Sequence, residues 1–172
     1  MASVWDEPVL AARLPGSAEA RQALTAYFRD IMGRYYGRPA TDAEVRAAMA
    51  ADPSDDLVPP AGLLLLAREG DEVVGCAGLL ALPGGIGELR RVWVSKAARG
   101  RGVGTMLVRA VEELARGRKL SALRLDTRHE LVEAHRLYAR EGYREVAPFS
   151  QGGMADMWFE KRLDLEWPMK SP

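Results

Sequence analysis

The residues with the clearest chemical potential form a basic, glycine-rich loop, Arg99-Gly100-Arg101-Gly102-Val103-Gly104, which leads into a predicted helix. The first turn of a helix leaves about four backbone N–H groups without partners and carries roughly half a positive charge. Glycines remove the Cβ atoms that would keep a phosphate away from those N–H groups, and the two arginines add permanent positive charge. The loop therefore indicates a binding site for a phosphate-bearing ligand.

Two other kinds of phosphate loop fit this sequence less well. A P-loop ends in Gly-Lys followed by Ser or Thr, and the lysine and the hydroxyl are missing here. A dinucleotide-binding loop, Gly-x-Gly-x-x-Gly, would use Asp126 as its ribose ligand, but Gly104 comes one residue early and too little chain follows for further βα units. A nicotinamide or flavin enzyme and a plain glycine-rich turn stay as the weaker alternatives.

The spacing Arg99-x-x-Gly102-x-Gly104, after a strand and at the start of a helix, resembles the acyl-coenzyme A pyrophosphate loop of the GNAT N-acetyltransferase superfamily. The resemblance implies acetyl-CoA as cosubstrate, with its pyrophosphate on the segment from Arg99 to Thr105. It also implies that the central strand splays just before this loop and frees backbone N–H groups for pantetheine and the developing oxyanion. The matching positions are Val92, Trp93 and Val94.

A second motif, Ala134-His135-Arg136-Leu137-Tyr138-Ala139-Arg140-Glu141-Gly142-Tyr143, resembles the family's A-x-x-L-Y-x-x-x-G-F/Y motif. The resemblance implies that Tyr138 is the general acid. A phenol of pKa about 10 is protonated at neutral pH and can donate to a departing thiolate of pKa about 8.5. The alternative is a core tyrosine on an amphipathic helix. Leu131 stands where many members have asparagine, so we expect no side-chain hydrogen bond to pantetheine from that position.

Glu88 lies eleven residues before Arg99, where many members of the family keep a basic glutamate. Its carboxylate would take the amine proton directly or through water. A salt bridge to Arg90 or Arg91 is the alternative role, and many relatives have no essential base. The resemblance places the acceptor on the first two helices and the loop after them, here Tyr27, Ile31, Tyr35, Tyr36 and the acidic loop from Asp52 to Asp56.

The composition indicates one globular domain, residues 1–172, with 48% hydrophobic residues and no apolar run long enough to span a bilayer. The first residues lack the order of a signal peptide, so we expect a cytoplasmic protein without a membrane partner. Cys76 lies in an apolar run, where a buried hydrophobe is expected rather than a nucleophile. One cysteine and two histidines predict no metal site.

The formal net charge is zero, but the charges are unevenly distributed. Residues 1–87 carry 12 acidic and 7 basic residues, whereas residues 88–119 carry 3 acidic and 9 basic residues. The basic block coincides with the glycine loop, which favours a compact polyanion such as coenzyme A over nucleic acid. A solvated basic face is the alternative. The acidic first half mildly favours a cationic acceptor.

Apolar periodicity and turn signals predict the element order β-α-α-β-β-β-α-β-α-β-β. The helix that begins at 103 has one apolar face at a period of 3.6 residues, formed by Val103, Met106, Leu107, Ala110, Val111, Leu114 and Ala115. Ser17 and the capping box Thr41 to Glu44 start the first two helices; Thr127 is the expected cap of the last, and Gly142 its expected end. This order predicts an α/β, single-domain GNAT-like fold with a mixed, mostly antiparallel sheet flanked by helices. The expected strands are 8–14, 63–68, 72–82, 86–94, 120–126, 143–146 and 157–163, and the expected helices begin after 17 and at 41, 103 and 130.

Together these features predict an acetyl-CoA-dependent N-acetyltransferase that transfers the acetyl group directly to a primary amine of a small molecule or peptide. The alternative is a non-catalytic GNAT-like module that binds acyl-CoA, although such a module needs neither Tyr138 nor Glu88. Homodimers are common among relatives, but the sequence indicates no interface. It does not identify the amine either.

Overall fold

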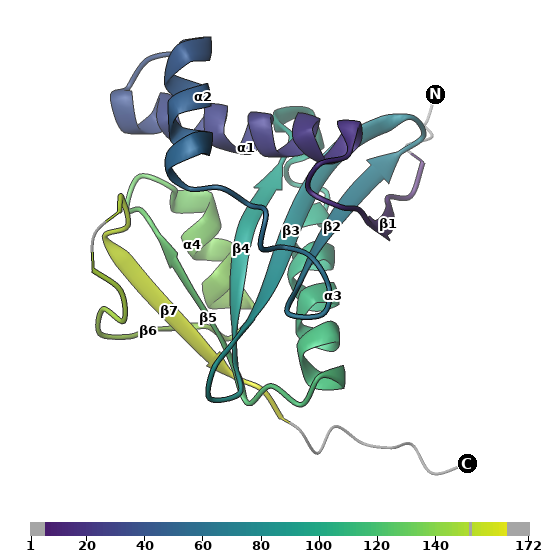
Figure 1. Cartoon of the computed structure of the whole chain (residues 1–172), viewed down its shortest axis with the longest axis vertical. Coiled ribbons are helices and arrows are strands. Elements are labelled where there is room, and N and C mark those ends of the chain that lie inside the picture. Colours follow the sequence, from purple (N-terminus) through teal and green to yellow (C-terminus); the bar gives the residue numbers. More distant parts are fainter. Residues whose placement is uncertain (1–5, 152, 165–172) are drawn as a thin grey trace.

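A seven-stranded sheet in the order β1-β2-β3-β4-β5-β7-β6 forms the centre of the computed structural model, which describes residues 6–151 and 153–164 (Figure 1). Neighbouring strands are antiparallel except for β4 and β5, which are parallel. This confirms the predicted mixed, mostly antiparallel sheet. The strands are β1 (Val9–Ala12), β2 (Gly62–Glu69), β3 (Glu72–Leu82), β4 (Ile86–Val94), β5 (Ala122–Thr127), β6 (Arg144–Glu145) and β7 (Met157–Arg162).

Four α-helices flank the sheet, two on each face (Figure 1). Helices α1 (Ala18–Tyr36) and α2 (Asp42–Ala51) cover one face, and α3 (Val103–Gly117) and α4 (Val132–Arg140) cover the other. A short 3-10 helix, Lys96–Ala98, precedes α3 and was not predicted. In the described part of the chain, no helix is both long enough and apolar enough to cross a bilayer.

The main core lies between the sheet and the pair α3 and α4. The predicted apolar face of α3 is confirmed, because Val103, Leu107 and Val111 are fully buried against the sheet. At about 25 cal/mol per Å² of apolar surface, each such side chain stabilises the fold by roughly 1.5–3 kcal/mol. On the opposite face Leu24 of α1 and the buried thiol of Cys76 belong to a second cluster, as expected for a core cysteine.

Three of the predicted helix ends are confirmed and one is wrong. The Ser17 hydroxyl accepts the Ala20 N–H, and both hydrogen bonds of the capping box between Thr41 and Glu44 are present. Gly142 follows α4 with φ 89°, a conformation that favours glycine. Thr127, however, does not cap α4: it is the buried last residue of β5, and the helix begins only at Val132.

The central strand β4 separates from β5 part-way along its length. The two strands pair only through Ile86–Glu88 and Ala122–Arg124, and beyond that point they diverge (Figure 1). A β-bulge opposite β3 bends β4, and Arg91 takes the left-handed conformation there with φ 56°. The backbone of β4 after Glu88 therefore has no strand partner on the β5 side, which is the splayed strand that the resemblance implied.

A buried carboxylate ties α3 to the C-terminal strands. Glu112 is only 3% exposed and accepts hydrogen bonds from the Tyr143 hydroxyl at 3.1 Å and from Lys161 Nζ at 2.9 and 3.0 Å. Burial, with the neighbouring Glu112 charge, raises the pKa of Tyr143, so this hydroxyl stays protonated and donates. A buried charge is tolerated only when it is paired and hydrogen-bonded, which these two partners ensure.

Replacing Glu112 by alanine should lower the free energy of unfolding by about 3 kcal/mol, because it leaves the Lys161 ammonium without its counter-charge in a largely buried position. Urea denaturation measures this change. Glu113→Ala is the matched control on the same helix, since its side chain is 66% exposed and should change stability by no more than about 0.5 kcal/mol. Equal losses for both variants would contradict the importance of the buried network.

Candidate active site

The splay of β4 and β5 opens a cavity of about 1320 Å³ between the two helical layers. Its walls come from α1 and α2 on one side and from the loop before α3, the start of α3 and α4 on the other. The cavity brings together nearly all of the residues predicted for a site: Glu88, Val92, Trp93, Val94, Arg99, Gly100, Gly102, Val103, Gly104, Thr105 and Tyr138.

The glycines at the start of α3 have two different structural roles. Gly100 and Gly102 have φ of 77° and 81°, and nothing lies within 4 Å of where a Cβ would be. Their role is conformational, since other residues rarely adopt this region. At Gly104 a Cβ would lie 3.1 Å from Leu137 Cδ2, so this glycine lets the first turn of α3 pack closely against α4. The helix N-terminus thus opens into the cavity beside α4.

The two arginines of the loop have different ion-pair partners, and only one of them lines the cavity. The Arg99 guanidinium lies in the cavity wall, where it pairs with Asp30 of α1 at 3.0 Å and donates to the Val94 carbonyl at 3.2 Å. Arg101 does not line the cavity; its guanidinium pairs with Glu69 of β2 at 2.8 Å. Of the two cations expected beside a phosphate, only Arg99 therefore faces the cavity.

Tyr138 reaches the cavity from α4 and is 6% exposed. Its ring packs against Tyr143 and Phe159, with centroid distances of 5.8 and 6.2 Å. Within the described residues its hydroxyl makes no hydrogen bond. Burial raises the pKa of Tyr138, and the nearby Tyr27 and Asp126 add to this effect, so the hydroxyl is a protonated donor throughout the neutral range.

Glu88 is half-buried where β4 and β5 separate, and it also lines the cavity. Burial raises the pKa of its carboxyl, whereas the charge of Arg90 opposes the rise. Arg90 Nε lies 3.4 Å from Glu88 Oε1. The salt bridge considered for this residue is therefore present, and it leaves the carboxylate in contact with the cavity.

Arg91, the residue of the bulge, fixes the acidic loop against β4. It is 6% exposed, donates to Ser54 Oγ and Asp52 Oδ2 at 2.9 Å each, and lies over the Phe28 ring at 4.9 Å. Arg90 pairs with Asp56 at 2.7 Å and with Asp52 at 3.4 Å. Two of the three carboxylates of the acidic loop, Asp52 and Asp56, are thus already paired with arginines.

Comparison with known proteins agrees with this geometry. The model of the Acetyltransferase (GNAT) family matches residues 25–143, a range that contains every residue predicted for the site. The chain belongs to the GNAT acetyltransferase family. Members of this family use acetyl-CoA as acyl donor.

Three relatives illustrate the relation to other GNAT proteins. An IAA acetyltransferase of Azospirillum brasilense is 37% identical over 90 residues, which cover 52% of this chain and 59% of that protein. The chain spans about three fifths of the length of the curated relatives it matches. Two solved structures share the fold. One is a GNAT acetyltransferase of Staphylococcus aureus Mu50 (TM-score 0.74, 16% identity, 92% and 100% coverage). The other is the PaiA N-acetyltransferase of Thermoplasma acidophilum with coenzyme A (0.67, 15%, 90% and 99%).

The GNAT motifs did not indicate two further cations in the site. Arg136 and Arg140 lie one turn apart on α4, are exposed and line the cavity. Neither has an ion-pair partner among the described residues. Both arginines flank Tyr138 in the second motif, and their i, i+4 spacing could have indicated that they share one face of the helix. The sequence does not show that α3 packs closely against α4, the contact that places them beside the glycine loop.

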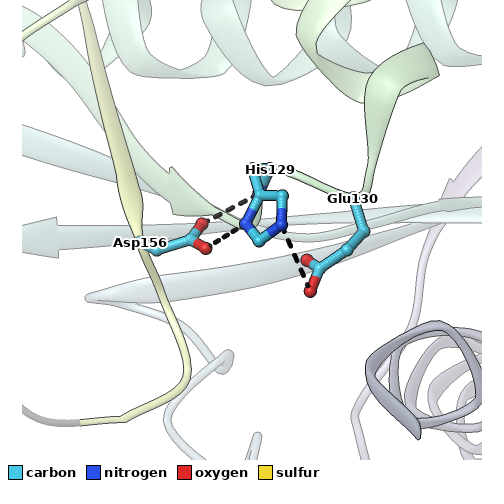
Figure 2. Close-up of side chains that lie close together, drawn as sticks. All are labelled: His129, Glu130 and Asp156. Atoms are coloured by element: carbon cyan, nitrogen blue, oxygen red, sulfur yellow. Dashed lines mark hydrogen bonds and ion pairs between the residues drawn. The ribbon is translucent and has the colours of Figure 1, made fainter. Parts of the chain in front are cut away.

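His129, Glu130 and Asp156 form a cluster that does not line the cavity but lies between the residues after β5 and the segment before β7 (Figure 2). The backbone N–H and Nδ1 of His129 both contact the Asp156 carboxylate, while Arg128 holds Glu130 at 2.7 and 3.0 Å. The three side chains offer ligand atoms within 4.8 Å of one another, but the Arg128 cation already occupies Glu130 and opposes a metal ion. We interpret the cluster as a latch that joins β5 to the segment before β7, which contributes Ser150, Met154 and Ala155 to the cavity wall.

This latch predicts a pH effect with a definite sign. The Asp156 carboxylate raises the pKa of His129 above its ordinary 6.5, so the stabilisation is complete below about 6.5 and is lost as the pH rises through the folded value. A proton NMR titration of the imidazole, assigned with His129→Gln, should give a midpoint above 6.5. Asp156→Asn should lower this midpoint, and an unchanged midpoint would contradict the latch.

Proposed function

We propose that this protein is an acetyl-CoA-dependent N-acetyltransferase that transfers the acetyl group directly to a primary amine of a small molecule or peptide. The observation that carries the proposal is that one cavity contains the N-terminus of α3, the part of β4 that β5 does not pair, and the Tyr138 hydroxyl, which has no hydrogen-bond partner among the described residues. Membership of the GNAT family and the coenzyme A complex of the PaiA relative support the choice of donor.

In this proposal the coenzyme binds along β4 and the start of α3. The segment from Arg99 to Thr105 holds the pyrophosphate through backbone N–H groups and the positive end of the helix. The Arg101 guanidinium is paired with Glu69, so Arg136 and Arg140 supply the positive charge for the phosphates instead. Pantetheine lies against residues 92–94, where backbone groups of β4 have no partner on the β5 side.

The transfer itself requires an amine, a polarised carbonyl and a stabilised leaving group. The amine nitrogen attacks the thioester carbon, the C–N bond forms, and the C–S bond breaks as the tetrahedral intermediate collapses. Glu88 takes the amine proton directly or through water. The Tyr138 hydroxyl donates to the departing sulfur; because burial raises its pKa, hydrogen bonding contributes more than complete proton transfer.

A non-catalytic acyl-CoA-binding module is the second candidate. Tyr138 and Glu88 in one cavity favour the enzyme, because binding alone uses neither group. The decisive experiment is free-thiol release from acetyl-CoA against amino acids, polyamines, aminoglycosides and short peptides. Release above the background without amine supports the transferase. Thermal stabilisation by acetyl-CoA without release for any acceptor would favour the module.

Tyr138→Phe should lower kcat about tenfold to a hundredfold, because the variant loses the donor to the thiolate. The dissociation constant of acetyl-CoA, measured by calorimetry, should stay within about twofold. Tyr36→Phe removes a hydroxyl from the acceptor side of the cavity wall, so it should change the KM of the amine at most and leave kcat unchanged. A parallel loss of kcat and coenzyme affinity in Tyr138→Phe would assign this residue to binding instead.

The phosphate-binding role of α3 is best tested at Thr105, since a side chain at Gly104 would also press on Leu137 of α4. Thr105→Glu places a negative charge in the first turn, which favours the helix dipole but repels a bound phosphate. We expect coenzyme A to bind at least about tenfold more weakly while the melting temperature does not fall. Thr105→Gln is the control for size. Unchanged affinity in Thr105→Glu would refute the pyrophosphate site.

A further inference from the structure

The carboxylates in the cavity wall differ in whether they have a counter-charge. Five of the six form ion pairs with arginines. Asp126 is the exception: its carboxylate makes no hydrogen bond or ion pair with any described residue. The five paired acids are Asp30 with Arg99 at 3.0 Å, Glu44 with Arg38 at 2.7 Å, Asp52 with Arg91 at 2.9 Å, Glu88 with Arg90 at 3.4 Å, and Glu133 with Arg34.

Asp126 lines the same cavity as Glu88 and Tyr138. Glu88 is in register with Arg124 of β5, so the alternation of the strand puts Glu88, Arg124 and Asp126 on the same face of the sheet. The Asp126 charge acts on both Tyr138 and Glu88 and raises the pKa of each. Asp126 therefore lies within electrostatic reach of the thiolate donor and of the proposed base, where the acceptor nitrogen must be during transfer.

We propose that Asp126 binds the ammonium group of the acceptor, and that the acceptor is a primary amine, cationic at neutral pH, on an apolar body. This inference rests on the proposed function and specifies its substrate class. The apolar body is inferred from the wall that α1 and α2 contribute opposite β4, which consists largely of Phe28, Ile31, Met32, Ala47, Ala48 and Ala51.

The charges around Asp126 explain why it suits a cation. Burial and the Asp52 charge raise the pKa of Asp126, whereas Arg90 and Arg91 lower it. These two arginines form their ion pairs with other carboxylates and leave Asp126 without a direct partner. An arriving ammonium group supplies the missing counter-charge, and such charge-assisted hydrogen bonds are about twice as strong as neutral ones. Glu88, already paired with Arg90, competes poorly for the same cation.

The test compares two acceptors of similar shape and different charge, benzylamine as the cation and aniline as the neutral amine. Thiol release at saturating acetyl-CoA gives KM and kcat for the full chain and for Asp126→Asn. We expect the KM for benzylamine to rise about tenfold to a hundredfold, as for a lost charged hydrogen bond, and the KM for aniline to stay within about twofold. Asp71→Asn removes a fully exposed charge that does not line the cavity and should change neither value.

Other outcomes separate this inference from the proposed function. Equal effects of Asp126→Asn on both acceptors, or acetylation of neutral and anionic acceptors without any cationic one, would overturn the role of Asp126 and leave the transferase intact. Acetyl-CoA binding without thiol release for any acceptor would overturn the proposed function and the inference with it. Circular dichroism and melting temperature confirm that Asp126→Asn folds, which we expect because the side chain keeps its size and loses no hydrogen bond or ion pair to a described residue.

Discussion

The structure depends on the point at which β4 leaves β5. Three paired positions hold the strands together, and the bulge at Arg91 then turns β4 away. Arg91 keeps this geometry because its buried guanidinium has partners on the acidic loop, at Asp52 and Ser54. An unpaired buried arginine would be costly, so the loop and the bulge stabilise each other. Without the splay, β5 would cover the strand edge and no cavity would exist.

Helix α3, which begins at the glycine loop, packs directly against α4, which carries Tyr138. Gly104 of α3 lies against Leu137 of α4, the residue before Tyr138. The other end of α4 is anchored by Tyr143, whose hydroxyl donates to the buried Glu112 of α3. One contact on α4 and one on the turn after it therefore set the position of Tyr138 relative to the N-terminus of α3.

Ion pairing determines which charges in the cavity wall remain available to a ligand. Most arginines and carboxylates in its wall neutralise one another across elements far apart in the chain, as Arg99 does with Asp30. The charges left without partners are Arg136 and Arg140 on the α4 side and Asp126 at the end of β5, within the described residues. Unpaired cations beside the glycine loop and one unpaired anion beside Tyr138 match a ligand pair in which the donor is anionic and the acceptor cationic.

The sequence by itself determined the elements, because their signals are local. The 3.6-residue apolar period of α3, the capping box at Thr41 and the turn at Gly142 each depend on residues a few positions apart, and each was confirmed. The loop and tyrosine motifs are equally local, so the family and most of the cavity lining were predictable. Only the tertiary structure decided which charges are free. Arg101 pairs with Glu69, β5 extends through Thr127, and Asp126 has no partner in the part of the chain that the structure describes, because ion pairs and strand ends depend on residues distant in the chain.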